Sequence, residues 1–350
     1  MTASHTELPE DLARGAALQA QRYRYKVWGF GEDIALRALL EVSRVLDDPE
    51  PAEFVTRLVG DWDASRGPLA PADHVTPGVV LLELHERLGG STFLDTALEL
   101  GRLLTSFPVV DGVAVHRRDL EGWRDTIWVD SMALDGPFLA RLGRATDDDG
   151  WTDHAGDALL GYARVLQGET GTFVHGYDVA THRPSPIHWG RGNGWALHAL
   201  VDTLEALPFG HPAVLETRER LNRLVAALVA LQHPECRWHT VLDDTTSPLE
   251  ASTPAFFASG VIKARRLALL TDELVADPAL ERMIVRAVAA LVTDAGADGG
   301  LPVSDATPIG DRATYVERSS GVFPWGQGPL ILTFTESRTG SRLAADGSPT

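Results

Sequence analysis

The chain has 350 residues, of which 44% are hydrophobic, so it can bury a large core as two domains or as one large closed architecture. Its net charge of -18, from 31 basic and 49 acidic residues, argues against nucleic acid or an anionic membrane as a partner, because the overall field repels both. Cys236 is the single cysteine, which excludes an intramolecular disulfide and a multi-cysteine zinc site.

The N-terminal segment, residues 1–15, is acidic and polar and has no apolar stretch of the kind that a signal peptide contains. No run of about 18 apolar residues occurs anywhere in the sequence. These features predict a cytoplasmic protein that has no membrane partner.

Apolar residues recur at intervals of three and four along most of the chain, which predicts helices rather than strands. The first helix is expected to contain Leu12, Ala16 and Leu18 and to end at Gly29. Further helices are expected within residues 31–49, 51–65, 76–90, 91–108, 131–148, 151–168, 192–208, 211–234, 252–270, 276–295 and 319–334.

About a dozen helices, joined alternately by short turns and by long loops, can pair antiparallel and close into a double-walled ring. The long loops carry Trp, His, Gly and Asp, so the pocket is expected at the end of the ring that bears them. A solenoid of stacked helix pairs would show a repeat of fixed period, and the sequence has none. We expect residues 1–336 to form a single domain and residues 337–350 to be a polar, disordered tail.

Residues 175–195, HGYDVATHRPSPIHWGRGNGW, form the loop that we expect to border a binding site. Its prolines and glycines exclude a helix for most of its length. His175 follows an apolar segment and is expected to point inward. Trp189 and Trp195 flank Arg191, so the rings can stack on a ring-shaped ligand while the guanidinium binds a carboxylate with two parallel hydrogen bonds. A buried arginine with a structural role between the two rings is the alternative.

Two aspartates in other long loops lie just ahead of predicted helices. Asp73 occurs in PADHVTPG and Asp130 in TIWVDSM, and either side chain can instead cap a helix or a turn. Asp130 lies in an apolar run beside Trp128, and the desolvation expected there favours the protonated form that a general acid needs. Asp135 is a rival to Asp130, although it lies within the helix and is expected to face outward or to make a polar contact in the core.

His116, in VAVHRRDLEGW, can donate to a ligand or lie on the surface. The histidines lack the HExxH spacing, and the GxxxxGK[ST] and GxSxG motifs are missing from the sequence, so we expect no metal ion, nucleotide or serine nucleophile. Two aspartates, histidines, an arginine and several tryptophans together favour a carbohydrate pocket.

Six segments of the chain share their order with a known group of enzymes: DHVTPGVVLLELHERLGG, TIWVDSMALDGPFLARLG, TGTFVHGYD, WGRGNGWAL, LQHPECRWHTVLDD and LEASTPAFFASGVIKA. From about Asp73 to the last helix, the sequence resembles the unsaturated glycuronyl hydrolases of glycoside hydrolase families 88 and 105, and among them most closely the unsaturated rhamnogalacturonyl hydrolases. The resemblance implies an all-α fold, the (α/α)6 barrel, and a hydrolase that uses no metal ion or cofactor.

The resemblance also implies a mechanism. The expected partner is an unsaturated uronide-containing oligosaccharide, which a polysaccharide lyase leaves with a C4=C5 double bond in its non-reducing uronic acid. Asp130 protonates C4, and a water activated by the same group adds at C5. The resulting hemiketal opens and expels the rest of the chain. Asp73 matches the second carboxylate of the family, which orients sugar hydroxyls.

The remaining expected site residues contact the substrate. His175 and Arg191 match positions that line the subsite, and Trp189 and Trp195 match stacking positions. His116 matches a histidine near the loop before the acid, and Trp128 adjoins the acid itself.

The chain departs from the family pattern at His74, because the motif usually reads Asp-Asn and here reads Asp73-His74. Whether the polar contact of the usual asparagine is kept stays open. Two other functions stay open as well. A sugar epimerase or isomerase would pair His175 with His188 or His239 as acid and base, and a sugar-binding protein would lack catalysis. The sequence is compatible with a monomer or a dimer.

Overall fold

The computed structural model describes residues 7–345, and the chain within this range is mostly helical, as predicted. Twelve α-helices longer than ten residues occur there: α1 (Glu10–Gln21), α2 (Asp33–Leu46), α3 (Glu50–Ser65), α4 (Gly78–Leu88), α5 (Thr92–Thr105), α6 (Met132–Thr146), α7 (Asp149–Leu166), α8 (Gly190–Ala206), α9 (Ala213–Leu231), α10 (Ser252–Arg266), α12 (Pro278–Asp294) and α14 (Pro324–Ala345). Four shorter helices are η1 (Pro71–Val75), η2 (Val129–Ser131), α11 (Asp272–Ala276) and α13 (Arg312–Val316).

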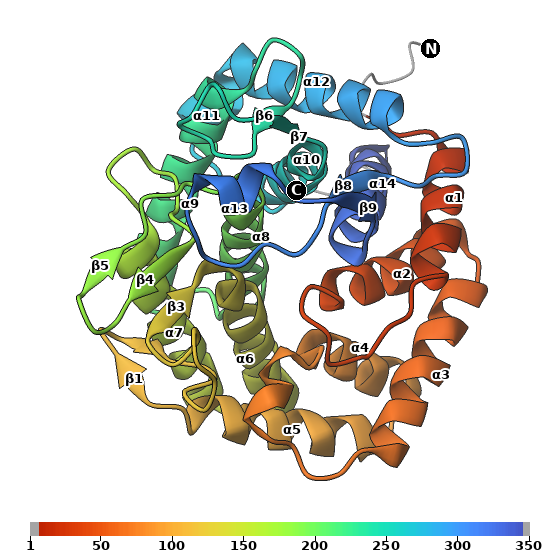
Figure 1. The fold of residues 1–350 in the computed structure, drawn as a ribbon. Coiled ribbons are helices and arrows are strands. Elements are labelled where there is room, and N and C mark those ends of the chain that lie inside the picture. The colour runs from red at the N-terminus through yellow and green to blue at the C-terminus, as the bar shows by residue number, and fades with distance from the viewer. Residues whose placement is uncertain (1–6, 346–350) are drawn as a thin grey trace.

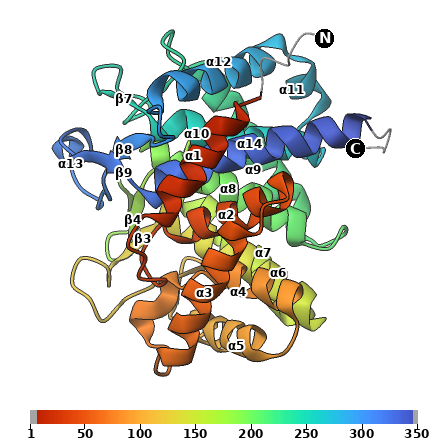
Figure 2. The same ribbon diagram turned by 90° about the vertical axis from the view of Figure 1, so that its right-hand side faces the viewer.

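The long helices form two layers (Figures 1 and 2). In the inner layer each helix contacts the next in the order α2, α4, α6, α8, α10 and α14, and α14 returns to contact α2. The outer helices α1, α3, α5, α7, α9 and α12 each pack against one or two inner helices. The described chain begins beside α12 and ends with the last residue of α14 (Figure 2).

Burial explains which helices lie inside. Every residue of α8 is buried except Glu205, because α8 contacts α6, α10, α7 and α9 on different sides. By contrast, α3 buries only Pro51, Val55 and Val59, which recur at intervals of four on one face. α8, which is buried on all sides, therefore lies in the inner layer, and α3, which buries a single stripe, lies in the outer layer.

The long loops contain short strands that the sequence analysis did not predict. They are β1 (Val109–Val110), β2 (Val113–Ala114), β3 (Thr126–Trp128), β4 (Gly176–Asp178), β5 (Arg183–Pro184), β6 (Trp238–His239), β7 (Leu249–Glu250), β8 (Pro302–Ser304) and β9 (Ser320–Val322). All pairings are antiparallel, in sheets of two strands or, for β3–β4–β5, of three. Strands of two or three residues are too short to show an alternating pattern, so the sequence carries no signal for them.

The first helix is shorter than predicted, because α1 ends at Gln21 and not at Gly29. The carboxylate of Glu32 accepts hydrogen bonds from the backbone N–H groups of Lys26 and Val27, at 2.8 to 3.1 Å. Val27 adopts a left-handed conformation with φ of 70°. The carboxylate thus holds residues 22–32 as a loop, a contact that helical periodicity does not reveal.

The predicted tail begins within a helix, because α14 continues past Ser337 to Ala345. The Ser337 hydroxyl donates to the Thr333 carbonyl, and Arg338 binds the Glu10 carboxylate on α1 at 2.7 Å. These contacts extend the helix beyond the apolar run on which the prediction rested. Residues 346–350 of the predicted tail lie outside the described residues, and the single domain stays a prediction.

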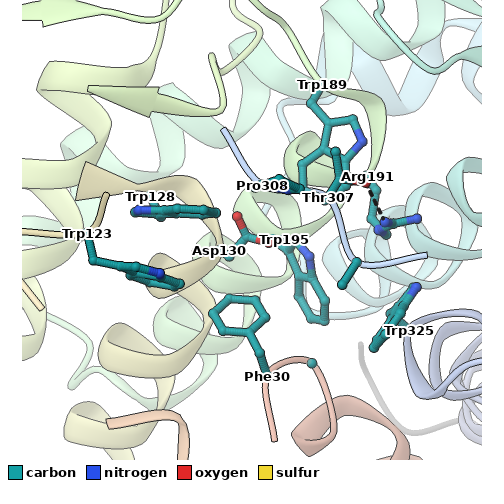
Figure 3. A pocket seen from close by; sticks show the side chains of 12 residues that line it. Phe30, Trp123, Trp128, Asp130, Trp189, Arg191, Trp195, Thr307, Pro308 and Trp325 are labelled. Atoms are coloured by element: carbon teal, nitrogen blue, oxygen red, sulfur yellow. Dashed lines mark hydrogen bonds between the residues drawn. The ribbon is translucent and has the colours of Figure 1, made fainter. Parts of the chain in front are cut away.

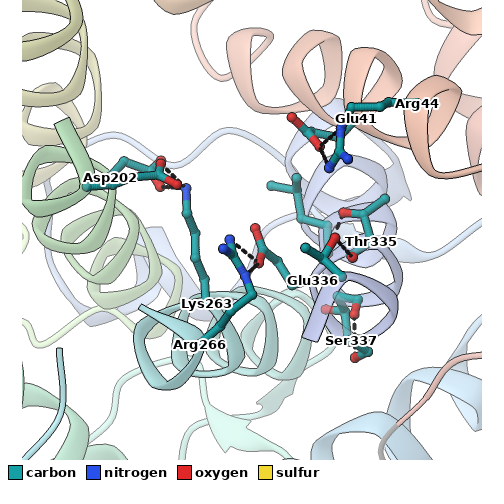
Figure 4. Close-up of polar contacts among 12 residues, drawn as sticks. Glu41, Arg44, Asp202, Lys263, Arg266, Thr335, Glu336 and Ser337 are labelled. Carbon is teal, nitrogen blue, oxygen red and sulfur yellow. Dashed lines mark hydrogen bonds and ion pairs between the residues drawn. The ribbon is translucent and has the colours of Figure 1, made fainter. Parts of the chain in front are cut away.

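A layer of ion pairs joins the inner helices farther along their axes (Figure 4). Asp202 on α8 accepts from Arg37 and Lys263, both at 2.6 Å, and Arg266 pairs with Glu336 at 2.7 Å. Burial alone would raise the pKa of Asp202, but the two cations hold it well below its usual range. A nearby cavity of about 180 Å³, the polar cavity, is lined by charged groups that include Glu41, Arg141 and Glu205. None of the helices between residues 7 and 345 is long and apolar enough to cross a membrane.

Candidate active site

A pocket of about 250 Å³ opens among the long loops. Figure 3 shows that the Asp130 carboxyl lies at its centre, between the rings of Trp128 and Trp195, with Phe30 beside it. The lining residues are Phe30, Gly31, Trp123, Trp128, Asp130, Trp189, Arg191, Trp195, Ala306, Thr307, Pro308 and Trp325. Five of the eight predicted site residues therefore line one pocket, and a sixth, His175, contacts Asp130.

A small sheet brings the two key side chains together. In the antiparallel pair β3–β4, Trp128 lies opposite Gly176, and the Val129 N–H donates to the His175 carbonyl at 2.9 Å. Asp130 is the second residue after β3, and His175 directly precedes β4. The register of this pair therefore places residues that are 45 positions apart in the sequence side by side.

Asp130 begins a hydrogen-bonded chain that leads away from the pocket. Its Oδ2 lies 3.0 Å from His175 Nε2, and His175 Nδ1 lies 2.7 Å from the Tyr315 hydroxyl. Asp130 is 5% exposed and His175 is fully buried. Burial, and then the charge of Asp130, raise the pKa of Tyr315 far above neutral pH, so this phenol keeps its proton. A proton can be held between Asp130 and His175, with Tyr315 fixing the other ring nitrogen.

Aromatic rings form the walls of the pocket. Trp123 stacks on Trp128 with centroids 4.2 Å apart, and Trp195 meets Phe256 edge to face at 4.7 Å. Trp325, at the start of α14, donates through its indole N–H to the Ser304 carbonyl. Such rings suit the apolar faces of a sugar ring.

Sequence reasoning missed several residues of the site: Phe30, Trp123, Tyr315, Trp325 and the Ala306–Pro308 segment. Phe30 and Trp325 each adjoin glycine, in WGFGED and FPWGQG, as Trp189 does in WGRGNGW. That aromatic-glycine pattern is a signal by which two of them could be found. Tyr315 lies on α13, far along the chain from His175, and no local pattern links the two.

Arg191 lines the pocket with its guanidinium largely engaged by the protein. Its Nη1 donates to Ser304 at 2.8 and 3.0 Å, and its Nη2 donates to the Asp305 carbonyl at 2.8 Å. Glu250 lies 3.5 Å away, and the Trp189 ring covers the guanidinium at 4.6 Å. The geometry agrees with a structural role, which is the alternative that the sequence leaves open. To bind a ligand carboxylate with two parallel hydrogen bonds, Arg191 would have to give up its hydrogen bonds to Ser304 and Asp305.

His116 lies behind the pocket and is not among its lining residues. Its Nε2 is 2.8 Å from Asp135 Oδ2, which also accepts from the Tyr162 hydroxyl at 2.8 Å. Asp135 is thus a polar contact in the core, one of the two outcomes expected for it. His74 packs its ring 4.9 Å from His116, and burial, with the nearby His116, lowers the pKa of His74 to about 3.

Asp73 is not among the residues that line the pocket either. It lies on η1, and its carboxylate accepts a hydrogen bond from the Ala70 N–H at 2.8 Å, so it caps this turn. The adjacent His74 connects this turn to the site, because its ring lies 5.8 Å from that of Trp123.

The histidine pairs of the epimerase alternative are not brought together at the pocket. His188 Nδ1 bonds to the Thr172 hydroxyl at 2.8 Å, and His239 Nδ1 donates to the Ser247 carbonyl at 2.6 Å. His175 faces Asp130 and Tyr315 instead. The site therefore contains one acid–histidine pair and not a pair of histidines.

A pocket walled by tryptophans around one buried carboxyl group places the protein in the class of carbohydrate-active enzymes. Residues 11–339 match the model of Glycosyl Hydrolase Family 88, and the chain belongs to this family of glycoside hydrolases. The chain is similar to the unsaturated rhamnogalacturonyl hydrolase YesR of Bacillus subtilis (strain 168), with 27% identity over 319 residues that cover 88% of each protein. It is also similar to an unsaturated 3S-rhamnoglycuronyl hydrolase of Alteromonas sp. (strain LOR), with 26% identity over 216 residues that cover 60% of this chain and 50% of that protein.

Solved structures share the fold. A possible member of the GH105 family from Salmonella enterica aligns with a TM-score of 0.83 at 21% identity, over 97% of this chain and 96% of that chain. The unsaturated glucuronyl hydrolase of Bacillus sp. GL1 aligns with a TM-score of 0.71 at 14% identity, over 93% of this chain and 94% of that chain. The family predicted from the sequence motifs is confirmed.

Proposed function

We propose that this protein removes a 4,5-unsaturated uronic acid from the non-reducing end of oligosaccharides that polysaccharide lyases produce. The observation that carries the proposal is the buried Asp130 carboxyl, bonded to His175 at 3.0 Å and surrounded by tryptophans. The two sequence relatives described above are hydrolases of unsaturated sugar units, which supports the substrate class. The similarity to YesR over most of both chains favours an oligosaccharide derived from rhamnogalacturonan.

In this reaction Asp130 transfers its proton to C4 of the vinyl ether, and positive charge develops at C5 and the ring oxygen. Water adds to C5 and returns a proton to the Asp130 carboxylate. The C5 hemiketal then opens to a ketone, and the hemiacetal at C1 collapses and releases the remaining saccharide. One carboxyl group thus serves as acid and then as base, whereas an ordinary glycosidase needs two at the anomeric carbon.

The direction of the inner helices supports an anionic substrate. The N-terminal ends of four inner helices, α2, α6, α8 and α14, lie at or beside the pocket. Residues nearer the C-terminal ends of the same helices line the polar cavity: Glu41, Arg141, Glu205 and Thr335. Helix N-termini carry partial positive charge, so this arrangement favours a carboxylate in the pocket. Arg191 adds a full charge, although its hydrogen bonds to the loop leave it acting mainly through its field.

Asp73 and His116 retain supporting roles in the proposal. The turn of Asp73 reaches the pocket through the contact between His74 and Trp123, and His116 packs against His74 from behind. The family resemblance implies that Asp73 orients sugar hydroxyls, and this role stays a prediction because its carboxylate is bound to the Ala70 N–H and is not among the groups that line the pocket. His116 would support Trp123 by way of His74, without touching the substrate.

The finer description of the fold belongs to the same proposal. We infer that the two layers of helices are the (α/α)6 barrel expected from the family, and the closed circuit of inner contacts from α2 to α14 supports it. A cytoplasmic location and the number of subunits stay predictions.

The test is an assay of purified protein with unsaturated disaccharides whose second sugar is rhamnose, an amino sugar or a sulfated sugar. Hydration of the double bond removes its ultraviolet absorbance, and we expect the fastest loss with the rhamnose compound. Unchanged absorbance with every disaccharide, accompanied by tight binding or by epimerisation of a saturated sugar, would contradict the proposal.

A further inference from the structure

A small niche extends the sugar pocket toward the centre of the inner layer. It measures about 20 Å³ and shares Phe30, Gly31, Asp130 and Trp195 with the larger pocket. Asp33, Arg37 and His198 line its far side. A volume of about 10 to 15 Å³ on this measure is enough for one water molecule, so the niche accommodates a water and not a sugar.

Two polar groups on α2 are left unmatched at this niche. Within the described chain Asp33 Oδ1 and Arg37 Nε are buried and have no hydrogen-bond partner. Asp33 Oδ2 faces Arg37 Nη1 at 3.7 Å, which exceeds hydrogen-bond length, and Arg37 Nη2 is bound to Asp202. A buried polar group without a partner destabilises the fold, so such groups normally bind ordered water.

The third polar residue of the niche, His198, already has hydrogen-bond partners in the protein. Its Nε2 lies 3.0 Å from the Ser259 hydroxyl and 3.2 Å from the Phe256 carbonyl. Burial lowers the pKa of His198 to about 4, so it is a neutral wall of the niche near pH 7. The charged groups left to hold a water are therefore the carboxyl groups of Asp33 and Asp130 and the guanidinium of Arg37.

We propose that Asp33 positions the water molecule that adds to C5 of the substrate, holding it in this niche against Asp130. The inference rests on the proposed function. Asp33 accepts a hydrogen bond from the water and Arg37 can donate one to it, so an oxygen lone pair is directed toward the pocket. After Asp130 has given its proton to C4, the water oxygen forms the bond to C5 and one water proton passes to the Asp130 carboxylate.

This assignment explains how one carboxyl group can serve both steps. The niche and the pocket share Asp130, so a water in the niche and a sugar in the pocket can both contact the same carboxyl group. Burial raises the pKa of Asp33 to about 6, and Arg37 partly opposes this shift. Above that pH Asp33 is an anion that attracts the proton of the water.

The kinetic test compares Asp33→Asn with Glu83→Gln. Glu83 is a mostly buried carboxylate bound to Arg141 at 3.3 Å, and it lines the polar cavity instead of the sugar pocket. We expect Asp33→Asn to lower kcat by about 10- to 100-fold with KM within about threefold. Glu83→Gln is expected to keep kcat within about twofold. Equal kcat in both variants and the wild type would overturn the assignment.

A second test distinguishes positioning of water from a general loss of structure. Methanol that adds at C5 gives a stable methyl ketal, which mass spectrometry separates from the hydrolysis products. Asp33→Ala enlarges the niche, so we expect the share of methyl ketal in aqueous methanol to rise several-fold over that of the wild type. An unchanged share would show that Asp33 does not border the attacking nucleophile.

The niche can also be tested apart from the reaction. A high-resolution crystal structure of the wild-type protein should show a water bonded to Asp33 and Asp130. If no unsaturated disaccharide is hydrolysed, the proposed function fails while this water still supports the niche. If hydrolysis occurs but the density places no water between the two carboxyl groups, the niche assignment fails alone.

Discussion

Asp130 Oδ2 lies 3.0 Å from His175 Nε2, with both side chains almost completely withdrawn from solvent. This pair and the tryptophans beside it define the chemistry of the pocket. A buried carboxyl group hydrogen-bonded to a buried histidine can share one proton with it, which is what an acid that later becomes a base requires.

The first prediction concerns Asp130. Asp130→Asn keeps the size of the side chain but removes the transferable proton, so kcat should fall by about 100- to 10,000-fold. Binding of the unsaturated disaccharide, measured by calorimetry, should change little, because the tryptophan walls remain. Turnover near that of the wild type would show that another group protonates C4.

Part of this site was predictable from the sequence, because WVD and HG-D are compact motifs in apolar surroundings. Their contact depends on β3 and β4, strands of three residues that show no periodicity. The helices were predictable because apolar residues repeat along them. The end of α1 was not predictable, because the Glu32 carboxylate binds the backbone N–H groups of Lys26 and Val27 and no local sequence pattern indicates these contacts.

Arg191 illustrates the other limit of prediction. The sequence suggested a guanidinium that binds a carboxylate, because Trp189 and Trp195 flank it. The structure shows its donors directed at Ser304 and Asp305, residues more than 110 positions later in the chain. Long-range partners of this kind decide whether a polar side chain is free for a ligand.

The second prediction concerns Tyr315. Its hydroxyl lies 2.7 Å from His175 Nδ1 and fixes the orientation of the imidazole. Tyr315→Phe should lower kcat by about 3- to 10-fold and stability by about 1 kcal/mol, the usual contribution of one buried hydrogen bond. A pH profile of kcat provides the decisive measurement. If the profile and kcat match those of the wild type while stability falls, Tyr315 has a structural role only.

The third prediction separates the two roles of Arg191. Arg191→Lys keeps the charge but loses the planar contacts with the loop, so we expect a loss of about 2–4 kcal/mol in the free energy of unfolding. If the charge serves the substrate through its field, KM for the unsaturated disaccharide should rise less in Arg191→Lys than in Arg191→Met. The matched control is the methyl ester of the disaccharide, which lacks the carboxylate. Equal effects of Arg191→Met on the acid and on its ester would remove Arg191 from substrate recognition.

The last prediction concerns His74, which replaces the asparagine usual in the family motif. Burial, then the nearby His116, lower the pKa of His74 to about 3, whereas a histidine in the unfolded chain has a pKa of about 6.5. Between these values the unfolded state binds a proton that the folded state does not. Above about pH 6.5 His74 is neutral in both states and does not reduce the free energy of unfolding. As the pH falls from 6.5 toward 3, protonation of His74 in the unfolded state lowers the free energy of unfolding.

His74→Asn removes this proton linkage. As the pH falls from 7 to 4, the wild type should lose about 3 kcal/mol of unfolding free energy relative to the variant, which urea denaturation at several pH values can measure. His154→Asn changes an exposed histidine on α7 and serves as the matched control, for which we expect the same pH dependence as in the wild type. Parallel stability curves for His74→Asn and the wild type would mean that His74 accepts a proton in the folded protein, so that its contact with His116 would have to open in acid.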